Sequence, residues 1–540
     1  MDEILRITED HRALAAEAYR FGKEVLGPLA DKHEAEKVIK PDAWQKLAEF
    51  GALGLSFPTE YGGSGVDPLG CTLVGESFGR AGADGGLMLS WGAHSFLFGA
   101  TLAEFCSPEQ MQRYLPKLAT GEIIGAFALT EPGAGSDAGG LRATYRPVEG
   151  GYVLNGQKTY ITNAPEGGLY LIFATKDPSL KQMGISAFLV ERDTDGLSIG
   201  PPMDKLCVRA SGTAEVFLED CFVPAENLVS AEGMGFFVGL TALEWDRSQL
   251  LSPLVGLMER SLDQAIEYAL QREQFGRPIA EFHAVQSMVA RLSSYITGSR
   301  WMVRRIAALK GQGGMHALEA AAAKCFCGGR ATAMASLAVQ AFGGAGLMDE
   351  VKVERAFRDS KLASIGGGTT EVQHLIMSKL LRDDRGALKP REIVLPDAAP
   401  ALLATVLEGA NKGRAWLLDT LAAADEIDAG GRPLAKTAPF GKQLSEAYVS
   451  LDAVCLMIEA ALVNEETDLE RLALETAIEL RHGWWLLHEM AVESLAGLPD
   501  AEHDAGLTKR SEETRSWLAR FPAAAQLEDQ LAEHLFVGYR

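Results

Sequence analysis

The spacing of apolar residues changes twice along this chain of 540 residues, and that change is the strongest constraint on its fold. Over residues 8–121 apolar residues recur every three or four positions, which is typical of amphipathic helices. Over residues 123–229 they recur every second position, in short runs separated by Gly, Asn and Asp, which is typical of strands. Long helical patterns rich in Ala and Leu return over residues 235–385. The sequence therefore predicts a mainly α protein with a central β domain.

This pattern divides the chain into four predicted parts. Residues 1–122 are expected to form an N-terminal helical domain, and residues 123–234 a small antiparallel β barrel or sandwich. Residues 235–388 are expected to form a four-helix-bundle-like domain, because an antiparallel bundle is the simplest packing for long helices. Three prolines between positions 390 and 400 mark a linker. The remaining residues, 389–540, are predicted to form a C-terminal helical extension.

Charge and cysteine content limit which partners and which cellular location we expect for the protein. The 51 basic and 73 acidic residues give a net charge of −22, which disfavours nucleic acid and anionic membranes as partners. Residues 391–540 alone hold 26 acidic and 13 basic residues, so an acidic outer face is expected there. Seven scattered cysteines favour reduced thiols and a cytoplasmic location. We find no secretion or transit signal and expect no transmembrane helix and no metal site.

A glycine-rich loop follows one of the predicted strands. The segment Glu131–Ala138 contains Gly-x-Gly-x-x-Ala, which superficially fits a dinucleotide-binding turn. A turn of that kind opens a helix, whereas further strand-like segments follow here, so we reject that interpretation. The alternative is a loop whose bare backbone approaches a ligand closely, with hydroxyl groups supplied by Thr130 and Ser136.

The loop is one of six segments that occur in the order and spacing of a known family. Together they resemble the acyl-CoA dehydrogenase family of flavoproteins over about residues 5–388. The other five are Tyr160–Asn163, Arg209–Thr213, Arg272–Gly276, Gln340–Gly346, and Arg358–Lys361 leading into Gly366–Glu371. The resemblance implies a helical, a β and a second helical domain around FAD, in agreement with the apolar spacing. The C-terminal extension lies outside the shared core.

The resemblance also implies roles for individual residues. The flavin ring is expected to lie against Leu129, Thr130, Gly135, Ser136, Tyr160 and Thr162, with Thr369 and Glu371 near the cofactor as well. The pyrophosphate and adenine end is expected to contact Arg272, Phe275, Gln340, Gly343 and Gly344 across a subunit interface, which implies an obligate oligomer. A guanidinium group can indeed bind a pyrophosphate with two hydrogen bonds. The alternative for Arg272 is an ion pair on a solvated helix, and the alternative for Phe275 is an ordinary core residue.

The implied reaction is oxidation of an acyl-CoA to the trans-2-enoyl-CoA. A base takes the α-proton while the β-hydrogen leaves as hydride to flavin N5, and electron-transferring flavoprotein is the implied electron acceptor. Because the α-proton of a thioester is only weakly acidic, the base must act in a water-excluded pocket in which hydrogen bonds stabilise the thioester oxygen.

The base position departs from the commonest pattern of the family. Most members carry a glutamate in Tyr-Glu-Gly-Thr, where this chain has Gly367, which cannot take a proton but can donate its N–H to the thioester carbonyl. A subset that includes isovaleryl-CoA dehydrogenase places its base on a helix just before an arginine, which matches Asp246 and Arg247. Glu244 lies about 200° away around such a helix, so it is expected to contact the CoA moiety instead. The implied substrate-binding residues are Ser136, Glu244 and Arg247.

Several alternatives remain open at this point. Asp246 could be an ordinary helix acid paired with Arg247, since the matching subset uses glutamate. As a base, aspartate is shorter than glutamate by about 1.5 Å, which suits a branched or cyclic acyl chain without ruling out a straight one. The same fold could also carry oxidase, monooxygenase or desulfinase chemistry, or a non-catalytic binding role, which the net charge disfavours. The extension resembles in position the added domain of very-long-chain members, which favours a homodimer.

Overall fold

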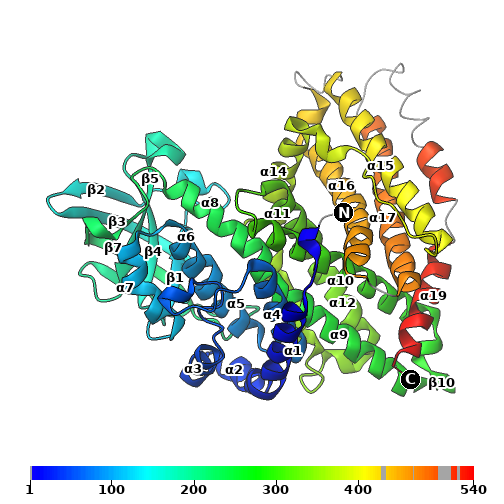
Figure 1. Cartoon of the computed structure of the whole chain (residues 1–540), viewed down its shortest axis with the longest axis horizontal. Coiled ribbons are helices and arrows are strands. Elements are labelled where there is room, and N and C mark those ends of the chain that lie inside the picture. The colour runs from blue at the N-terminus through cyan, green and yellow to red at the C-terminus, as the bar shows by residue number, and fades with distance from the viewer. Residues whose placement is uncertain (1–2, 427–432, 466–467, 497–511, 520–522, 540) are drawn as a thin grey trace. The chain divides into compact units, whose positions relative to one another are not determined.

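The computed structural model describes residues 3–426, 433–465, 468–496, 512–519 and 523–539 (Figure 1). The chain forms two compact units. The N-terminal unit comprises Glu9–Leu257 with Ala307–Met315, and the C-terminal unit comprises Met1–Thr8, Met258–Ile306 and His316–Arg540. The four-part division expected from the sequence is finer than these two units and stays a prediction.

The N-terminal unit begins with helices, as the apolar spacing predicts. They are α1 (Glu9–Phe21), α2 (Ala30–Glu36), α3 (Pro41–Glu49), α4 (Pro68–Ala81), α5 (Gly85–Gly92), α6 (Thr101–Phe105) and α7 (Pro108–Ala119). Local sequence signals set several of their starts. Asp67 and Asp84 cap α4 and α5 by accepting from backbone N–H groups, and Ser107 forms a reciprocal capping box at the start of α7.

An eight-stranded sheet follows the helices of the N-terminal unit. Its strands are β1 (Gly125–Ala128), β2 (Thr144–Val148), β3 (Gly151–Thr162), β4 (Leu169–Thr175), β5 (Ile185–Glu191), β6 (Leu197–Ile199), β7 (Thr213–Pro224) and β8 (Leu228–Val229). They pair in the order β6-β7-β3-β2-β4-β5-β8, with β1 beside β4. The predicted period of two and the mainly α fold with a central β domain are therefore confirmed.

Two details of the predicted β domain are wrong. The sheet is mixed rather than antiparallel, because β1 runs parallel to β4 and β2 touches β4 in parallel register. A connection of some forty residues separates β1 from β4, long enough for the crossover that a parallel pair needs. Among the described strands the path also ends at the short strands β6 and β8 without closing, so no barrel forms.

Strand β4 is buried on both faces, and its side chains alternate between two cores. Leu169, Leu171 and Phe173 pack with apolar residues of α6, α7 and α8, the helix Gly235–Trp245. Tyr170 and Ile172 point to the other side, into a core shared with β3, β5 and β7. Strands β5 and β7 also contact each other although three strands separate them in the sheet, so the sheet curls around this second core.

The C-terminal unit is helical apart from one two-stranded hairpin, β9 (Glu273–Gln274) and β10 (Arg277–Pro278), among the described residues. Two of its helices, α9 (Ser252–Gln271) and α10 (His283–Lys310), begin or end in the N-terminal unit. The others are α11 (Ala317–Ala323), α12 (Gly329–Ala341), α13 (Val353–Ala363), α14 (Thr370–Asp383), α15 (Ala401–Glu426), α16 (Ala438–Val463), α17 (Leu469–Ala496) and α19 (Ala524–Val537).

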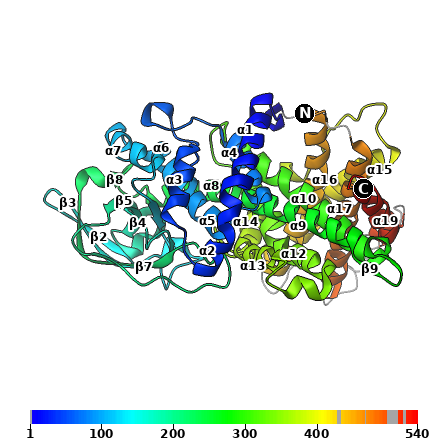
Figure 2. The same ribbon diagram turned by 90° about the horizontal axis from the view of Figure 1, so that it is seen from below.

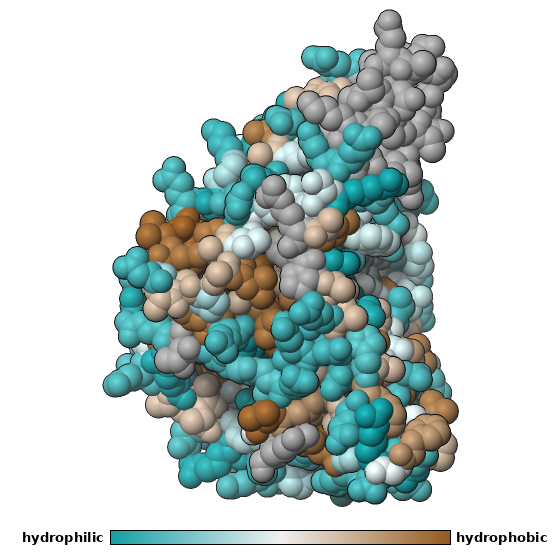
Figure 3. Space-filling model, turned by 90° about the vertical axis from the view of Figure 1, so that its right-hand side faces the viewer, coloured by the Kyte–Doolittle hydropathy of each residue, from teal (hydrophilic) through white to brown (hydrophobic). Residues whose placement is uncertain are grey.

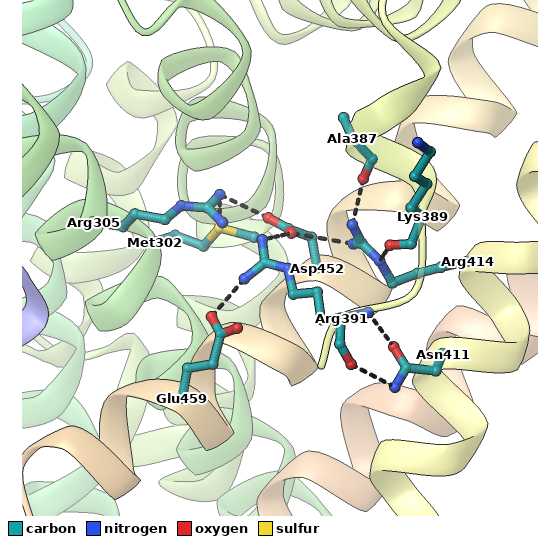
Figure 4. A network of polar contacts seen from close by, with 9 residues as sticks. All are labelled: Met302, Arg305, Ala387, Lys389, Arg391, Asn411, Arg414, Asp452 and Glu459. Carbon is teal, nitrogen blue, oxygen red and sulfur yellow. Dashed lines mark hydrogen bonds and ion pairs between the residues drawn. The ribbon is translucent and has the colours of Figure 1, made fainter. Parts of the chain in front are cut away.

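Helix α16 forms the centre of the C-terminal unit. It packs against α14, α15 and α17, and α17 runs beside it in both views (Figures 1 and 2). Its Asp452 is fully buried, and three guanidinium groups surround it (Figure 4). Arg305 of α10, Arg391 of the linker and Arg414 of α15 lie 2.7, 2.6 and 3.3 Å from its carboxylate oxygens. These charges connect the extension to the family-like helices that precede it.

The outer face of the C-terminal unit is mostly hydrophilic, with hydrophobic side chains gathered in separate patches (Figure 3). Among the described residues, no helix is long and apolar enough to cross a membrane. All seven cysteines are free thiols.

Candidate functional site

The glycine-rich loop of the N-terminal unit presents open backbone. Glu131 and Ala134 exchange two backbone hydrogen bonds of 3.1 Å, which holds the turn Glu131–Ala134 closed. Gly133 and Gly135 are exposed, and no atom lies within 4 Å of where a Cβ would stand on either residue. The loop can therefore bring its peptide groups close to a ligand, as the glycine content predicts.

A buried ion pair fixes this loop from beneath. The Lys158 ammonium lies 2.6 Å from Glu131 Oε1 and also donates to the Leu129 carbonyl oxygen at 3.2 Å. The Glu131 carboxylate accepts two further hydrogen bonds, from the backbone N–H groups of Arg142 and Ala143. Burial lowers the pKa of Lys158 to about 8, although the neighbouring carboxylate partly opposes the shift. The ion pair thus attaches the loop to β3, and both oxygens of the Glu131 carboxylate have hydrogen-bond partners.

The end of β3 brings Tyr160 and Thr162 to the same region. Thr159 donates its N–H to the Thr130 carbonyl oxygen at 2.9 Å, which ties strand and loop together. The pairing of β3 with β7 shifts register between Lys158 and Ile161, and Tyr160 within this bulge has a left-handed φ of 57°. Its side chain is 70% exposed, so the backbone irregularity projects an aromatic ring outward.

The candidate base lies at the end of α8. Glu244, Asp246 and Arg247 are all buried, with 1%, 8% and 7% of their surfaces exposed. From Asp246 to Leu250 the helix widens to a π-helix, a feature that often accompanies functional sites. Helix α8 also faces the loop, because a methyl group on Gly239 would lie 4.0 Å from a Leu129 methyl. The structure thus places two carboxylates and a guanidinium in a water-poor setting.

The C-terminal unit carries the other predicted cofactor residues. Arg272 and Phe275 lie on the hairpin β9–β10, where every residue from 271 to 277 is exposed. The Phe275 ring is 93% exposed, and both turn residues have positive φ, 53° at Phe275 and 78° at Gly276. An aromatic residue rarely adopts that conformation, and an apolar ring is seldom so exposed.

An aromatic contact links the helix before this hairpin to the other predicted cofactor residues, Gln340, Gly343 and Gly344. Tyr268, one turn before Arg272, stacks on Phe342 with ring centroids 4.5 Å apart. Phe342 directly precedes Gly343 and Gly344, which are exposed and have no atom within 4 Å of a Cβ position. Gln340 is exposed as well. Arg272, Phe275, Gln340, Gly343 and Gly344 therefore share one region of the C-terminal unit.

Thr369 and Glu371 do not join that group. Thr369 caps α14, and a Cβ on Gly329 would lie 3.0 Å from the Thr370 methyl group, so this segment lies at the start of α12. Gln340 lies at the other end of α12, about 16 Å away along the helix axis. Gly367 and Gly368 have φ values of 67° and 92°, which explains the run of glycines before Thr369.

Comparison with known proteins identifies the family. The sequence matches the descriptions "Acyl-CoA dehydrogenase, N-terminal domain" over residues 8–122, "middle domain" over 126–221 and "C-terminal domain" over 233–381. It is 37% identical to mitochondrial isovaleryl-CoA dehydrogenase of Oryza sativa subsp. japonica over 365 residues, which cover 67% of this chain and 89% of that protein. The chain belongs to the acyl-CoA dehydrogenase family. As a member of this family, the protein is an FAD-dependent oxidoreductase of acyl-CoA-like substrates.

Two further relatives extend the comparison. The L-prolyl-[peptidyl-carrier protein] dehydrogenase of Pseudomonas fluorescens is 37% identical over 360 residues, covering 66% of this chain and 94% of that protein. A crystal structure of an acyl-CoA dehydrogenase of Bacillus anthracis complexed with FAD superposes with a TM-score of 0.84 at 27% identity. It covers 98% of this chain and 95% of its own, so the C-terminal extension is shared with a solved relative.

The residues present fit FAD. A pyrophosphate requires donors and unobstructed backbone, which Arg272 and the open glycines of residues 343–344 supply. A flavin ring requires an apolar surface, which the exposed ring of Tyr160 offers beside the loop. No cluster of metal-ligating side chains occurs among the residues that the structure describes.

Sequence reasoning missed Lys158 and the role of the Glu131 side chain. The two residues are 27 positions apart, so no local spacing rule connects them. The available signal is a lysine within the region of predicted strands, since a buried ammonium group requires a carboxylate beside it.

Proposed function

We propose that this enzyme oxidises an acyl-CoA to the 2-enoyl-CoA and that Asp246 is the base that removes the α-proton. The burial of Asp246 at the π-helical end of α8 is the observation that carries the proposal. A carboxylate is a stronger base when little water surrounds it, because desolvation disfavours its charged form. The commoner base position is Gly367, whose φ of 67° suits glycine and would strain a glutamate.

The other predicted residues divide the remaining tasks. The Gly367 N–H is proposed to donate to the thioester carbonyl, where negative charge develops as the α-proton leaves. Glu244 and Arg247 are proposed to contact the CoA part of the substrate, and Ser136 to touch both substrate and cofactor. The chemistry that FAD supplies when bound is acceptance of the β-hydrogen with its electron pair. Asp246 then holds the α-proton on its carboxylate until product leaves.

The proposed cofactor contacts follow the two groups found above. Leu129, Thr130, Gly135, Ser136, Tyr160 and Thr162 are proposed to contact the flavin ring, with Thr369 and Glu371 also near the cofactor. Arg272, Phe275, Gln340, Gly343 and Gly344 are proposed to bind the pyrophosphate and adenine of FAD held by a second copy of the chain. We propose a homodimer, because the exposed Phe275 ring is then covered by the other subunit.

The acyl chain and the electron acceptor are also proposals. The short side chain of Asp246 favours a branched or cyclic acyl group, which fits the similarity to isovaleryl-CoA dehydrogenase. Electron-transferring flavoprotein is the proposed acceptor. A cytoplasmic location is supported by the seven free thiols.

The test of the base is Asp246→Asn. This variant keeps the shape of the side chain but cannot accept the proton, so acyl-CoA should still bind while flavin reduction slows by about 10² or more. Anaerobic stopped-flow absorbance with a panel of straight, branched and cyclic acyl-CoAs measures both quantities and identifies the chain. Glu244→Gln is the matched control, because it should weaken CoA binding more than it slows reduction. Flavin reduction at the wild-type rate in Asp246→Asn would exclude Asp246 as the base.

The same instrument separates dehydrogenase from oxidase chemistry. Reduced enzyme should reoxidise slowly in air and rapidly with electron-transferring flavoprotein. Fast reoxidation by oxygen, with the flavoprotein without effect, would favour the oxidase or monooxygenase alternative instead.

A further inference from the structure

The hairpin β9–β10 is too small to hold its own shape. It has two paired positions, Gln274 with Arg277 and Glu273 with Pro278, and one backbone bond from the Ile279 N–H to the Arg272 carbonyl oxygen closes its base. Two-stranded hairpins of this size are marginal in water without packing against other elements. The position of Phe275 and Arg272 therefore depends on what holds the two helices that flank the hairpin, α9 before it and α10 after it.

The last helix of the extension, α19, contacts both of those helices. Asp529 of α19 lies 2.5 Å from Nδ1 of His283, the first residue of α10. Two residues after the end of α19, the Tyr539 hydroxyl donates to the carboxylate of Asp263 on α9. Figures 1 and 2 both show α19 beside the hairpin. A helix near the end of the chain thus spans the two elements between which the predicted cofactor residues lie.

A chain of contacts leads from α19 to the tip of the hairpin. His283 directly follows Phe282, whose ring meets the Phe275 ring edge-on with centroids 6.0 Å apart. The Arg277 guanidinium covers the same Phe282 ring at 4.2 Å. Holding His283 in place therefore also holds the Phe282 ring, the aromatic neighbour of Phe275 at the tip of the hairpin.

The attachment of α19 to the rest of the unit is separate from these contacts. Its apolar face buries Leu527, Leu531 and Leu535, and the helix packs on α17. A second histidine pair, His534 with Asp468 at 2.7 Å, ties it to the residue just before α17. Removal of the contacts to α9 and α10 should thus leave α19 docked.

We propose that α19 positions the cofactor hairpin, with Asp529 and Tyr539 acting through His283 and Asp263 to keep Phe275 and Arg272 in the conformation that receives FAD. Asp529 and Tyr539 are positioning residues, since each is proposed to act through another side chain, His283 or Asp263. The proposal rests on the cofactor role of Arg272 and Phe275 proposed above, and it gives the C-terminal extension a part in flavin binding.

The test uses the full-length apoprotein and its affinity for FAD. The double variant Asp529→Asn/Tyr539→Phe removes the carboxylate charge beside His283 and the hydroxyl that donates to Asp263, with little change of shape. Exposed ion pairs and single hydrogen bonds contribute modestly, so the dissociation constant of FAD should rise about fivefold. Hydrogen exchange of amides 273–278 should quicken by a similar factor, because local opening of the hairpin becomes easier. Asp529→Glu, which keeps the carboxylate, should restore the wild-type values.

His534→Asn is the matched control, because it breaks the other histidine–aspartate pair of the same helix without touching α9 or α10. It should leave FAD affinity and hairpin exchange unchanged. Equal behaviour of the double variant and this control would overturn the proposal, provided that Arg272→Glu loses FAD. If Arg272→Glu keeps its FAD, the cofactor role of the hairpin is wrong, and the part of the proposal that concerns flavin binding falls with it. Hydrogen exchange separates this failure from the other, because faster exchange of amides 273–278 in the double variant alone still shows that α19 holds the hairpin.

Discussion

At the scale of single residues, Phe275 combines an exposed ring with a left-handed backbone. The positive φ of both Phe275 and Gly276 corresponds to a type I′ hairpin turn, for which Asn-Gly is the most favourable sequence. Phe275 occupies the first position at a local conformational free energy of about 1–2 kcal/mol. Such strain at an exposed site supports the binding role that we propose for the ring.

We expect Phe275→Asn to separate stability from binding. Asparagine relieves the strain, so the melting temperature of the apoprotein should stay the same or rise, while the loss of the ring should raise the FAD dissociation constant about tenfold. Phe275→Ala is the control that removes the ring but keeps the strain, and it should lower both the melting temperature of the apoprotein and its affinity for FAD. Calorimetry measures the melting temperature, and flavin titration measures the affinity. Unchanged FAD affinity in Phe275→Asn would contradict the role of the ring.

From the buried histidine His94 we predict how the stability of the folded protein changes with pH. Complete burial lowers its pKa from 6.5 to about 4, and its neutral ring bonds the Gly125 N–H and the Leu118 carbonyl oxygen. Between pH 6.5 and 4 the unfolded chain therefore binds the proton more readily than the folded one, so stability falls as the pH falls through that window. The full difference is about 3 kcal/mol.

Urea unfolding at pH 7.5 and pH 5 checks this expectation. His94→Gln should be less stable than wild type at pH 7.5 but should lose less stability on acidification. The exposed His534→Asn variant is the control and should follow the wild-type pH dependence. A His94→Gln curve parallel to that of wild type would show that another group dominates acid unfolding.

At the scale of elements, the sequence predicts the helices and strands that follow from the local spacing of apolar residues. It does not predict features that depend on contacts between distant segments. The spacing of apolar residues predicts the strands from 123 to 229 and the helices on either side. The glycine run at 366–368 corresponds to a backbone with positive φ at Gly367 and Gly368. The parallel pairing of β1 with β4 has no local signal, because both strands are buried and either direction would bury the same residues. The π-helical turn at Asp246 was likewise not foreseeable from residue types.

The Glu131–Lys158 pair gives a prediction at this scale. Lys158→Met leaves a buried carboxylate without its counter-charge, which should destabilise the protein by about 3–5 kcal/mol and loosen the Gly-rich loop. The double variant Glu131→Gln/Lys158→Met removes both charges and should recover much of the stability. Urea midpoints and FAD affinity report the two effects. If the double variant is no more stable than Lys158→Met, the pair is not the coupled unit described here.

At the scale of the whole molecule, the extension was predictable as helical, but its attachment was not. The prolines near 390–400 suggest a linker, whereas Arg391 within it is fixed by Asp452 and Glu459, each at 2.6 Å. Burial raises the pKa of Asp452, but the three surrounding arginines outweigh this and hold it well below its usual range. The contacts join residues separated by 38 to about 150 positions, beyond the reach of sequence spacing.

We expect Asp452→Asn to be among the most destabilising single changes in the C-terminal unit. It leaves three guanidinium groups around an uncharged amide, which should lower the free energy of unfolding by about 3–5 kcal/mol. Glu459→Gln is the milder control, since Glu459 pairs with Arg391 at the edge of the cluster. Urea unfolding followed by far-UV circular dichroism measures both. Equal midpoints for the two variants would contradict the central place of Asp452.

The cluster around Asp452 also bears on the order in which the chain assembles. Arg305 emerges from the ribosome well before Asp452, the carboxylate that lies beside it in the part of the chain that the structure describes. Until α16 is made, Arg305 therefore lacks this counter-charge. The helices made first therefore cannot complete their packing until α16 has been synthesised and supplies Asp452. Newly made chains that stop short of α16 should remain bound to chaperones, while full-length chains are released.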